Sequence, residues 1–314
     1  MTSQRAYGEC VIKAGGGARM DAPLLSVLTP FHRHDPAPLI ERLANESVRD
    51  VELVLLDDGT GSAELLERVL TAAARAAFPV RVVVWDKNRG RAHGRNRLIE
   101  EARGGHVLFL DADMIPDAPD FLGRWVDLIQ SANPCVAFGG LSAPRKAEPE
   151  TALHRFLFAR SDCRPAKTRA KDAAQFSAAS NLLVRRDILT ATPFDNAFTG
   201  WGWEDVDWAL RAARLGAIQH IDNPATHAGL DTVATLLRKY REAGPNYARL
   251  ARKHPEAVRR FASYRAARWL QRAPWTQRLR TSLAWFAAFE PAPLPARHAA
   301  LKLYRTAIYA EHLP

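Results

Sequence analysis

Short apolar runs alternate with amphipathic stretches along the chain from residue 24 onward. Four of these runs predict β-strands, at residues 24–28, 51–56, 80–85 and 106–110. The stretches between them carry apolar residues at helical spacing, and Ser62 is a suitable N-cap for one of the helices. Continuous apolar strands separated by amphipathic helices are typical of a parallel sheet covered on both faces. The pattern therefore predicts an α/β fold with a mostly parallel, Rossmann-like sheet.

The pattern is less regular after residue 113. We expect a helix through Phe121 and Trp125, a strand at 135–141, a loop-rich insert at 142–175, a return to the sheet at 176–184, a turn and helix at 201–216, and a last strand at 218–221. Helical patterns dominate from Thr232, with interruptions expected at Pro245, Pro255, Pro274 and 291–295. This predicts a weakly structured segment at 1–22, a catalytic domain at 23–230 and a helical extension at 231–314.

The positive charge of the chain is concentrated in the extension. The 314 residues carry a formal net charge of +10, and residues 231–314 alone hold 16 basic and 5 acidic residues. Two interpretations remain open for the extension: a solvated set of helices packed beneath the domain, or an amphipathic membrane-surface element with Trp269, Trp275, Trp285, Phe286 and Phe289 among arginines. No recognised nucleic-acid motif accompanies the charge, so we expect no nucleic-acid partner.

Cysteine usage and hydropathy indicate the compartment. Cys10, Cys135 and Cys163 are far apart and odd in number, which supports neither a disulfide framework nor a zinc finger. No apolar run approaches the roughly 20 residues of a membrane span, and the N-terminus lacks the apolar stretch of a signal peptide. We therefore expect a cytoplasmic protein, with peripheral contact to the inner face of the membrane as an open possibility.

Acidic residues follow two of the predicted strands. Asp111 and Asp113 follow the strand at 106–110, and Asp57 follows the strand at 51–56. In open α/β sheets ligands bind outside the carboxyl ends of the strands. One carboxylate of the Asp111–Asp113 pair can hold a ribose hydroxyl while the other binds Mg²⁺ or Mn²⁺, which keeps substrate phosphates as ligands. Asp57 can bond a base or ribose, although each motif taken alone also fits an ordinary turn.

Other donors of the expected crevice are less specific. Arg95 lies one helical turn past Gly90 and can approach a diphosphate with its forked donors. His227 follows the last candidate strand and can complete a metal site with Asp113, and His220 is a competing candidate. Neither a GxGxxG nor a P-loop motif is present, so neither dinucleotide nor P-loop binding is supported.

The segment at 198–208 combines glycine, tryptophan and acidic residues. Gly200 and Gly202 flank Trp201 and permit tight turns, and Trp201 and Trp203 offer an apolar wall for a sugar face. Glu204 and Asp205 then open a helix, whose dipole keeps carboxylates ionised. An ionised carboxylate in a cleft can serve as the general base for a hydroxyl nucleophile.

Together these motifs resemble the family 2 glycosyltransferases of the GT-A fold over about residues 23–230. The motifs, in order, are Leu-Ser-Val-Leu-Thr-Pro-Phe at 25–31, Leu-Leu-Asp-Asp-Gly at 55–59, Asn-Arg-Gly-Arg-Ala-His-Gly-Arg-Asn at 88–96, Val-Leu-Phe-Leu-Asp-Ala-Asp at 107–113 and Gly-Trp-Gly-Trp-Glu-Asp-Val-Asp at 200–207. The last one resembles the Gly-Trp-Gly-Gly-Glu-Asp element of galactosyltransferases and chondroitin-type polymerases, with Trp203 in place of a glycine.

The resemblance implies a role for each matching residue. It places Thr29, Pro30, Asp57, Arg95 and Asp111 at the nucleotide-sugar donor, Asp113 and His227 at Mn²⁺ or Mg²⁺, Asp205 as the base, Glu204 as the acceptor-orienting acid, and Trp201 and Trp203 at the acceptor. It also implies polysaccharide-type chemistry, in which a sugar passes from a donor such as a UDP-sugar to a glycan or lipid-linked hydroxyl with inversion.

Two other classes remain as alternatives. A sugar-nucleotide nucleotidyltransferase shares the substrate class, but its usual glycine-rich phosphate loop is missing from residues 29–33. A basic protein that binds nucleic acid or membrane without catalysis is the other alternative, and only the charged extension favours it.

Overall fold

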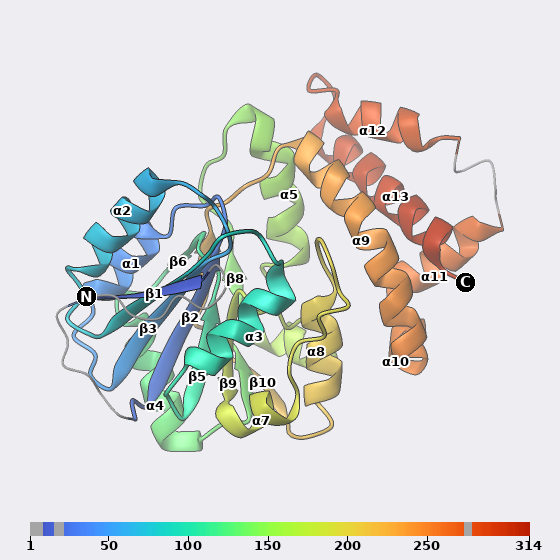
Figure 1. Ribbon diagram of the computed structural model, residues 1–314. Helices are drawn as coiled ribbons and strands as arrows, with labels where there is room; N and C mark the ends of the chain where they lie inside the picture. The colour runs from blue at the N-terminus through green and yellow to red at the C-terminus, as the bar shows by residue number, and fades with distance from the viewer. Residues whose placement is uncertain (1–8, 16–21, 273–277) are drawn as a thin grey trace. The chain divides into compact units, whose positions relative to one another are not determined.

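The chain forms two compact units in the computed structural model, which describes residues 9–15, 22–272 and 278–314 (Figure 1). The sheet unit comprises residues 1–142, 164–194 and 208–229, and the helical unit comprises 143–163, 195–207 and 230–314. This division differs from the one expected at residue 230, because two segments from the middle of the chain belong with the C-terminal helices.

The sheet unit is built on an eight-stranded sheet in the order β1-β4-β3-β2-β5-β9-β7-β10. Its strands are β1 Glu9–Ala14, β2 Leu25–Phe31, β3 Val51–Asp57, β4 Val80–Trp85, β5 His106–Leu110, β7 Val136–Phe138, β9 Asn181–Arg185 and β10 Ile218–His220. The pairs β2–β3, β3–β4, β2–β5 and β7–β10 are parallel, and β9 runs antiparallel to β5 and β7. A small second sheet joins β6 Met114–Pro116, β11 Ala225–His227 and β8 Leu141–Ser142.

Helices cover both faces of the large sheet, as the apolar strands require. The helices of this unit are α1 Ala37–Ala44, α2 Ala63–Ala73, α3 Arg91–Glu101, α4 Phe121–Ala132, α6 Ala166–Arg169 and α7 Arg186–Ala191. One core cluster joins the sheet to α1, α2 and α4, and a second joins the opposite face to α3, α7 and Trp208. The predicted cap of α2 is confirmed, because Ser62 Oγ accepts a hydrogen bond from the Leu65 amide over 3.2 Å.

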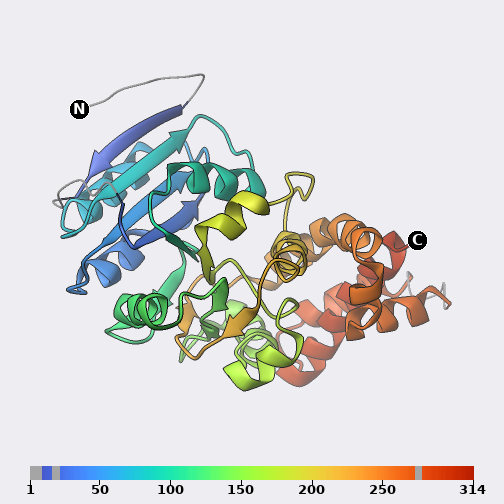
Figure 2. The ribbon, with the colours of Figure 1, turned by 90° about the horizontal axis from the view of Figure 1, so that it is seen from below.

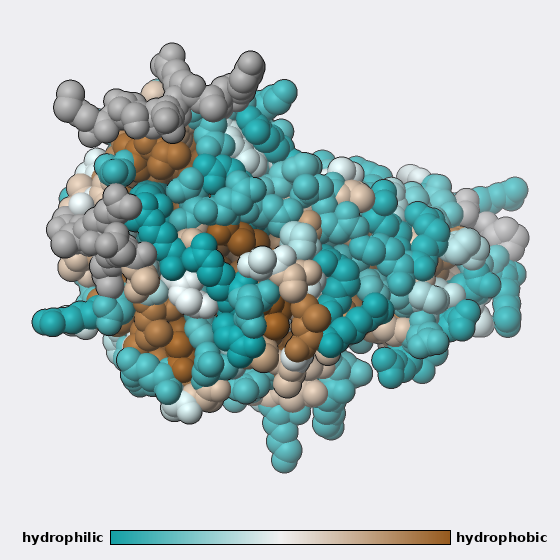
Figure 3. Space-filling model, turned by 60° about the horizontal axis from the view of Figure 1, so that its bottom comes forward, coloured by the Kyte–Doolittle hydropathy of each residue, from teal (hydrophilic) through white to brown (hydrophobic). Residues whose placement is uncertain are grey.

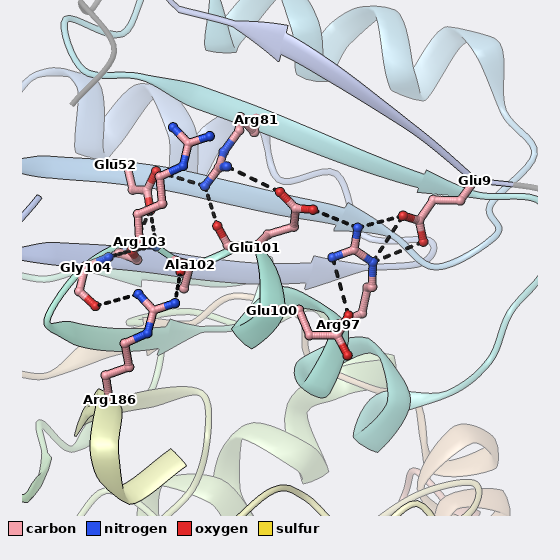
Figure 4. Close-up of polar contacts among 11 residues, drawn as sticks. Glu9, Glu52, Arg81, Arg97, Glu100, Glu101, Ala102, Arg103, Gly104 and Arg186 are labelled. Atoms are coloured by element: carbon pink, nitrogen blue, oxygen red, sulfur yellow. Dashed lines mark hydrogen bonds and ion pairs between the residues drawn. The ribbon is translucent and has the colours of Figure 1, made fainter. Parts of the chain in front are cut away.

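The N-terminal segment was expected to be weakly structured, and this was wrong for residues 9–14. They form β1, which pairs antiparallel with β4 along the edge of the sheet (Figure 2). A chain of alternating charges anchors this edge (Figure 4): Glu52, Arg81, Glu101, Arg97 and Glu9. The distances along it are between 2.7 and 3.3 Å. A strand without strong hydrophobicity is thus stabilised by partners far away in sequence.

The helical unit contains α5 Ala152–Ser161, α9 Val233–Lys253, α10 Pro255–Arg259, α11 Ala262–Gln271, α12 Arg280–Ala288 and α13 Leu294–His312. Helix α13 packs against α5, α9, α11 and α12 (Figure 1). Helix α8, Glu204–Ala212, contains the boundary between the two units.

Two expectations about helices were wrong. The region 142–175 holds α5 and α6 rather than mainly loop, because α5 buries Leu153 and Leu157 on one side despite its polar residues. Pro245 does not interrupt α9 but lies inside it, since the buried neighbours of the proline hold the helix together. The interruption expected at Pro274 lies outside the described residues.

Surface and covalent features agree with the composition. None of the three cysteines, all within the described part of the chain, forms a disulfide. Across the described residues, the helices are too short or too polar for any of them to traverse a bilayer. The face in Figure 3 is mainly hydrophilic, and its hydrophobic surface is divided into separate areas.

Candidate functional site

The acidic residues of the sheet unit lie at one edge of the sheet. Strands β2, β3 and β5 are parallel, and the β2–β3 register places Phe31 opposite Asp57. Asp57 is therefore at the carboxyl end of β3, as Asp111 is just beyond the carboxyl end of β5. The sequence prediction that these carboxylates share one edge is confirmed by this topology.

Asp57 and its neighbour Asp58 have different surroundings. Asp57 Oδ1 accepts a hydrogen bond from the Thr60 amide over 2.8 Å, which closes a tight turn. Asp58 accepts hydrogen bonds from the amides of Arg89 and Gly90 over 2.7 and 3.1 Å, so it ties the β3 loop to the β4 loop. Burial raises the pKa of Asp58, and these two hydrogen bonds partly counteract the rise. The sequence did not distinguish Asp58 as the residue that joins the loops.

Two arginines of α3 hold Asp111. Arg95 Nη2 lies 3.1 Å from Asp111 Oδ1, and Arg91 Nη2 lies 3.2 Å from Asp111 Oδ2. The Arg95 side chain is only 1% exposed, whereas that of Arg91 is 39% exposed. Arg95 therefore supports the carboxylate from inside the protein, and Arg91 carries its charge at the surface. The sequence analysis missed Arg91, although its position one helical turn before Arg95 places both on the same face of α3.

Asp113 and His227 are brought together by the small sheet. Strand β11 pairs with β6 so that His227 lies opposite Met114, and His227 Nε2 is 3.2 Å from Asp113 Oδ2. Burial alone would raise the pKa of Asp113, but the hydrogen bond and charge of His227 outweigh it and lower the pKa to about 2. The competing His220 instead bonds the Ala173 carbonyl through Nε2.

The surroundings of this pair suit a hard divalent cation. A side-chain carbon added at Gly229 would lie 2.2 Å from Asp113 Oδ2, so the backbone leaves room for the carboxylate only because glycine is there. A carboxylate and an imidazole are acceptable ligands for Mn²⁺-class ions, which take further oxygens from substrate phosphates and water. Within the described residues, no group of three or more potential ligand side chains is present. The pair fits a cation that also requires ligands from its substrate.

Thr29 and Pro30 lie near the carboxyl end of β2. Thr29 is fully buried, and its Oγ1 has no hydrogen-bond partner among the described residues. Pro30 is half-buried. A buried hydroxyl without a partner is a rare cost in a folded protein, and one that a bound polar ligand can remove.

The Gly-Trp-Gly-Trp turn belongs to the helical unit. Gly200, Gly202 and Trp203 have φ angles of 71°, 90° and 75°, in the left-handed region. Helix α8 begins immediately afterwards at Glu204, which is buried, and Asp205 is half-buried. Trp201 and Trp203 are also half-buried. The turn thus ends with two carboxylates at a helix N-terminus, as the sequence predicts.

Comparison with known proteins indicates the family of this chain. Residues 26–191 match the family described as "Glycosyl transferase family 2". An uncharacterized glycosyltransferase of Haemophilus influenzae is 31% identical over 98 residues, covering 30% of this chain and 38% of that protein. The uncharacterized glycosyltransferase EpsJ of Bacillus subtilis is 32% identical over 95 residues, covering 29% and 26%. The chain spans about half or less of the length of the curated relatives it matches, from 12% to 53%.

Solved structures share the GT-A fold of this chain. Mannosyltransferase PcManGT from Pyrobaculum calidifontis, in complex with GDP-Man and Mn²⁺, has a TM-score of 0.57 at 18% identity and covers 92% of this chain and 87% of its own. Residues 1–349 of TarS from S. aureus, in complex with UDP-GlcNAc, have a TM-score of 0.54 at 16% identity, covering 91% and 90%. The expected α/β fold with a mostly parallel sheet and C-terminal helices is therefore confirmed.

Proposed function

The chain belongs to glycosyltransferase family 2, and we propose that it transfers a sugar from a nucleotide-sugar donor, most simply a UDP-sugar, to a hydroxyl of a glycan or lipid-linked acceptor. The observation that carries the proposal is the pairing of Asp113 and His227 at the strand edge that also holds Asp57 and Asp111. Family membership makes the enzyme a glycosyltransferase, and the choice of donor and acceptor is our proposal.

Asp113 and His227 would hold Mn²⁺ or Mg²⁺ together with the donor diphosphate. A carboxylate is ionised at neutral pH, and Asp113 would bind the cation in this form together with the neutral imidazole of His227. The bound cation would supply positive charge against the leaving nucleoside diphosphate. PcManGT, of the same fold, has been solved with GDP-Man and Mn²⁺, which supports this assignment.

The remaining strand-end residues would bind the donor. We assign Asp57 to the base, Asp111 to the ribose, and Thr29 with Pro30 to the wall of the nucleotide pocket. Arg95 would act mainly by holding Asp111, because its guanidinium is buried against that carboxylate. The more exposed Arg91 would face the negative charge of the donor, where a forked guanidinium suits phosphate oxygens.

The turn at 200–205 would serve the acceptor. Asp205 would take the proton of the acceptor hydroxyl as its oxygen attacks the anomeric carbon. The bond from that carbon to the diphosphate oxygen breaks in the same step, so a single displacement inverts the anomeric configuration. Glu204 would orient the acceptor, and Trp201 and Trp203 would contact a sugar face. Water must be excluded, because it would otherwise replace the acceptor.

Product analysis tests the proposal. The full chain is incubated with nucleotide sugars, Mn²⁺ and candidate acceptors, after a thermal-shift panel has selected the donor that stabilises the native state. Release of nucleoside diphosphate together with an inverted glycosidic product, assigned by NMR, is the expected result. Release of pyrophosphate would instead indicate nucleotidyl transfer, the alternative enzyme class.

We also propose that α11 and α12 contact an anionic membrane surface. Among the described residues, six large hydrophobic side chains are exposed, and four of them lie in or directly beside these helices: Trp269, Leu279, Trp285 and Phe289. Residues 262–289 contain five arginines and no acidic residue. Aromatic and basic side chains together favour anionic lipid interfaces. Trp275, also expected to take part, lies outside the described residues.

Vesicle sedimentation tests the membrane contact. We expect the chain to sediment with vesicles containing phosphatidylglycerol and to remain in solution with neutral vesicles. A Trp285→Ser/Phe289→Ser variant should lose this binding, whereas Leu215→Ser, which changes an exposed apolar residue elsewhere, should keep it. Equal binding by both variants would contradict the proposal.

A further inference from the structure

The backbone of the candidate catalytic turn is in a conformation that its own sequence disfavours. Trp203 has a φ of 75°, and a non-glycine residue is uncommon in this region, especially a bulky one. Gly200 and Gly202 reach similar angles without a side-chain clash. Such a conformation persists only where surrounding contacts over-determine it. The contacts that hold Trp203 are therefore needed to explain the turn.

Two tyrosines from the C-terminal helices hold the Trp203 indole. Its ring centroid lies 4.7 Å from that of Tyr247 on α9 and 5.8 Å from that of Tyr309 on α13. The indole Nε1 donates a hydrogen bond to the Tyr309 hydroxyl over 3.2 Å. The two tyrosine rings stack on each other at 4.2 Å and are buried. The Trp203 indole thus packs against the stacked Tyr247–Tyr309 pair.

A third residue of the extension holds the backbone of the turn itself. Asn246 on α9 is buried, and its Nδ2 lies 2.8 Å from the Thr199 carbonyl oxygen and 3.0 Å from that of Gly202. The Trp201 carbonyl oxygen lies at 3.4 Å from the same nitrogen. The side-chain amide of Asn246 therefore contacts three backbone carbonyl oxygens of the segment that precedes α8.

The first turn of α8 is fixed by the end of α9. Asp207 is fully buried, and its Oδ1 lies 2.7 Å from Lys253 Nζ and 2.9 Å from His254 Nε2. The Asp207 amide donates a hydrogen bond to the Trp203 carbonyl over 3.0 Å. Lys253 therefore balances the charge of Asp207 on the first turn of α8, the turn that also carries Glu204 and Asp205.

From these contacts we infer that the C-terminal extension positions the catalytic turn, with Asn246 and the Tyr247–Tyr309 pair as positioning residues for Glu204 and Asp205. The inference rests on the proposed function, which assigns these acids to the acceptor. It assigns the basic C-terminal extension an indirect role in catalysis, through the position of these two acids. It also explains how tryptophan is tolerated at position 203: aromatic packing and one hydrogen bond offset the backbone preference for glycine.

Steady-state kinetics of Asn246→Ala and Tyr309→Phe test the inference. Both changes remove a hydrogen bond to the turn and leave the donor residues of the sheet unit untouched. We expect kcat to fall by about 10- to 100-fold for Asn246→Ala, because small misplacement of reacting groups has effects of this size. The effect of Tyr309→Phe should be smaller, since the ring stacking remains. The dissociation constant of the donor should stay within about twofold of the wild-type value, because these changes leave the ground-state interactions with the donor unaffected.

A stability-matched control separates positioning from general destabilisation. Val258→Ala creates a small cavity in α10, where the side chain is fully buried, and has no assigned contact with the turn. It should lower the melting temperature but leave kcat per folded molecule and the pH profile of kcat unchanged. In Asn246→Ala the acidic limb of that profile should move, since it reports the base held by the turn.

Two results would overturn the inference: an unchanged kcat in Asn246→Ala, or the same loss of kcat in Val258→Ala. Asp205→Asn distinguishes this failure from failure of the proposed function. If Asp205→Asn is inactive while Asn246→Ala is fully active, only the positioning role is wrong. If Asp205→Asn retains full activity, the assignment of the turn to catalysis is itself wrong.

Discussion

His227 Nε2 lies 3.2 Å from Asp113 Oδ2, although the two residues are far apart in the sequence. Strand β11 pairs with β6 so that His227 lies opposite Met114, the residue that follows Asp113. The Asp113 carbonyl also accepts a hydrogen bond from the Ala228 amide over 2.8 Å, so backbone and side chain fix the same pairing. We propose that this arrangement preorganises the pair for binding a cation.

Removing either member of this pair should weaken cation-dependent donor binding. We expect Asp113→Ala and His227→Ala each to lower the affinity for a nucleoside diphosphate in the presence of Mn²⁺ by about tenfold or more. Isothermal titration with and without Mn²⁺ measures the effect. Glu256→Gln, an exposed change on α10, is the control. Variants that keep the full Mn²⁺ dependence of wild type would exclude Asp113 and His227 as ligands.

Gly229→Ala should have a related effect without removing any ligand. The added carbon would meet Asp113 Oδ2 at 2.2 Å, well inside contact distance, and the carboxylate must move away. We expect weaker Mn²⁺-dependent binding of nucleoside diphosphate with a smaller loss of affinity than in Asp113→Ala. Gly123→Ala is a suitable control, because a side-chain carbon at Gly123 meets no atom within 4 Å. Identical affinities for wild type and Gly229→Ala would show that the carboxylate position is not critical.

Asp205→Asn should abolish sugar transfer while leaving donor binding unchanged. A general base contributes about 10²- to 10⁴-fold to rate, and asparagine cannot accept the proton. We therefore expect kcat to fall by about that factor while the donor dissociation constant remains near that of wild type. Rapid-quench measurement of a single turnover tests the chemical step directly. An equal loss of binding and turnover would assign Asp205 to the donor or to the structure.

Substitution of Arg95 should mainly affect stability, whereas substitution of Arg91 should mainly affect donor affinity. Arg95→Met removes a buried partner of Asp111, and we expect it to lower the free energy of unfolding by about 3 kcal/mol. Arg91→Met removes the more exposed partner, so its effect on unfolding should be well under 1 kcal/mol. Its effect on donor affinity should be the larger one, if it faces the donor charge. Urea denaturation and nucleotide titration together separate the two, and a reversed order would contradict our assignment.

Acid should destabilise the sheet unit partly through His106. Burial lowers the pKa of this histidine below its ordinary value of 6.5, and the ring bonds the Pro134 carbonyl. Below pH 6.5 the unfolded chain binds the proton more readily, so stability is present above that pH and is lost as pH falls toward the folded-state pKa. The free energy of unfolding falls by at most about 1.4 kcal/mol for each unit by which the folded-state pKa of His106 lies below its unfolded-state pKa. Denaturation at pH 7.5 and 5.5 should show a smaller loss in His106→Gln than in wild type.

The sequence predicted β3, β4 and β5 to within one residue and the presence of the helices between the strands, whereas β2 continues beyond the predicted 24–28 to Phe31. Strand β4 and strand β5 begin and end where the apolar runs do, and Ser62 caps α2. These features depend on local periodicity and local hydrogen bonds, which a short segment contains in full. The acidic strand ends were predictable for a related reason, because parallel strands must direct their carboxyl ends to one edge.

Elements with weak local signals were the ones mispredicted. Strand β1 has no strong apolar run and is held by β4 and by the Glu9–Arg97 ion pair. Helix α5 mixes polar and apolar residues, and α9 continues through Pro245. In each case contacts with distant parts of the chain outweigh the local preference, and those contacts are not visible in the segment itself.

The site divides in the same way. The sequence by itself determined which residue types follow each strand and that glycines surround Trp201, since these follow directly from order along the chain. Only the tertiary structure decided that Asp113 pairs with His227 and that Arg91 shares Asp111 with Arg95. It also decided that Trp203 adopts a left-handed conformation against Tyr247 and Tyr309. Pairings between distant segments arise from packing of whole elements, which no single stretch of sequence encodes.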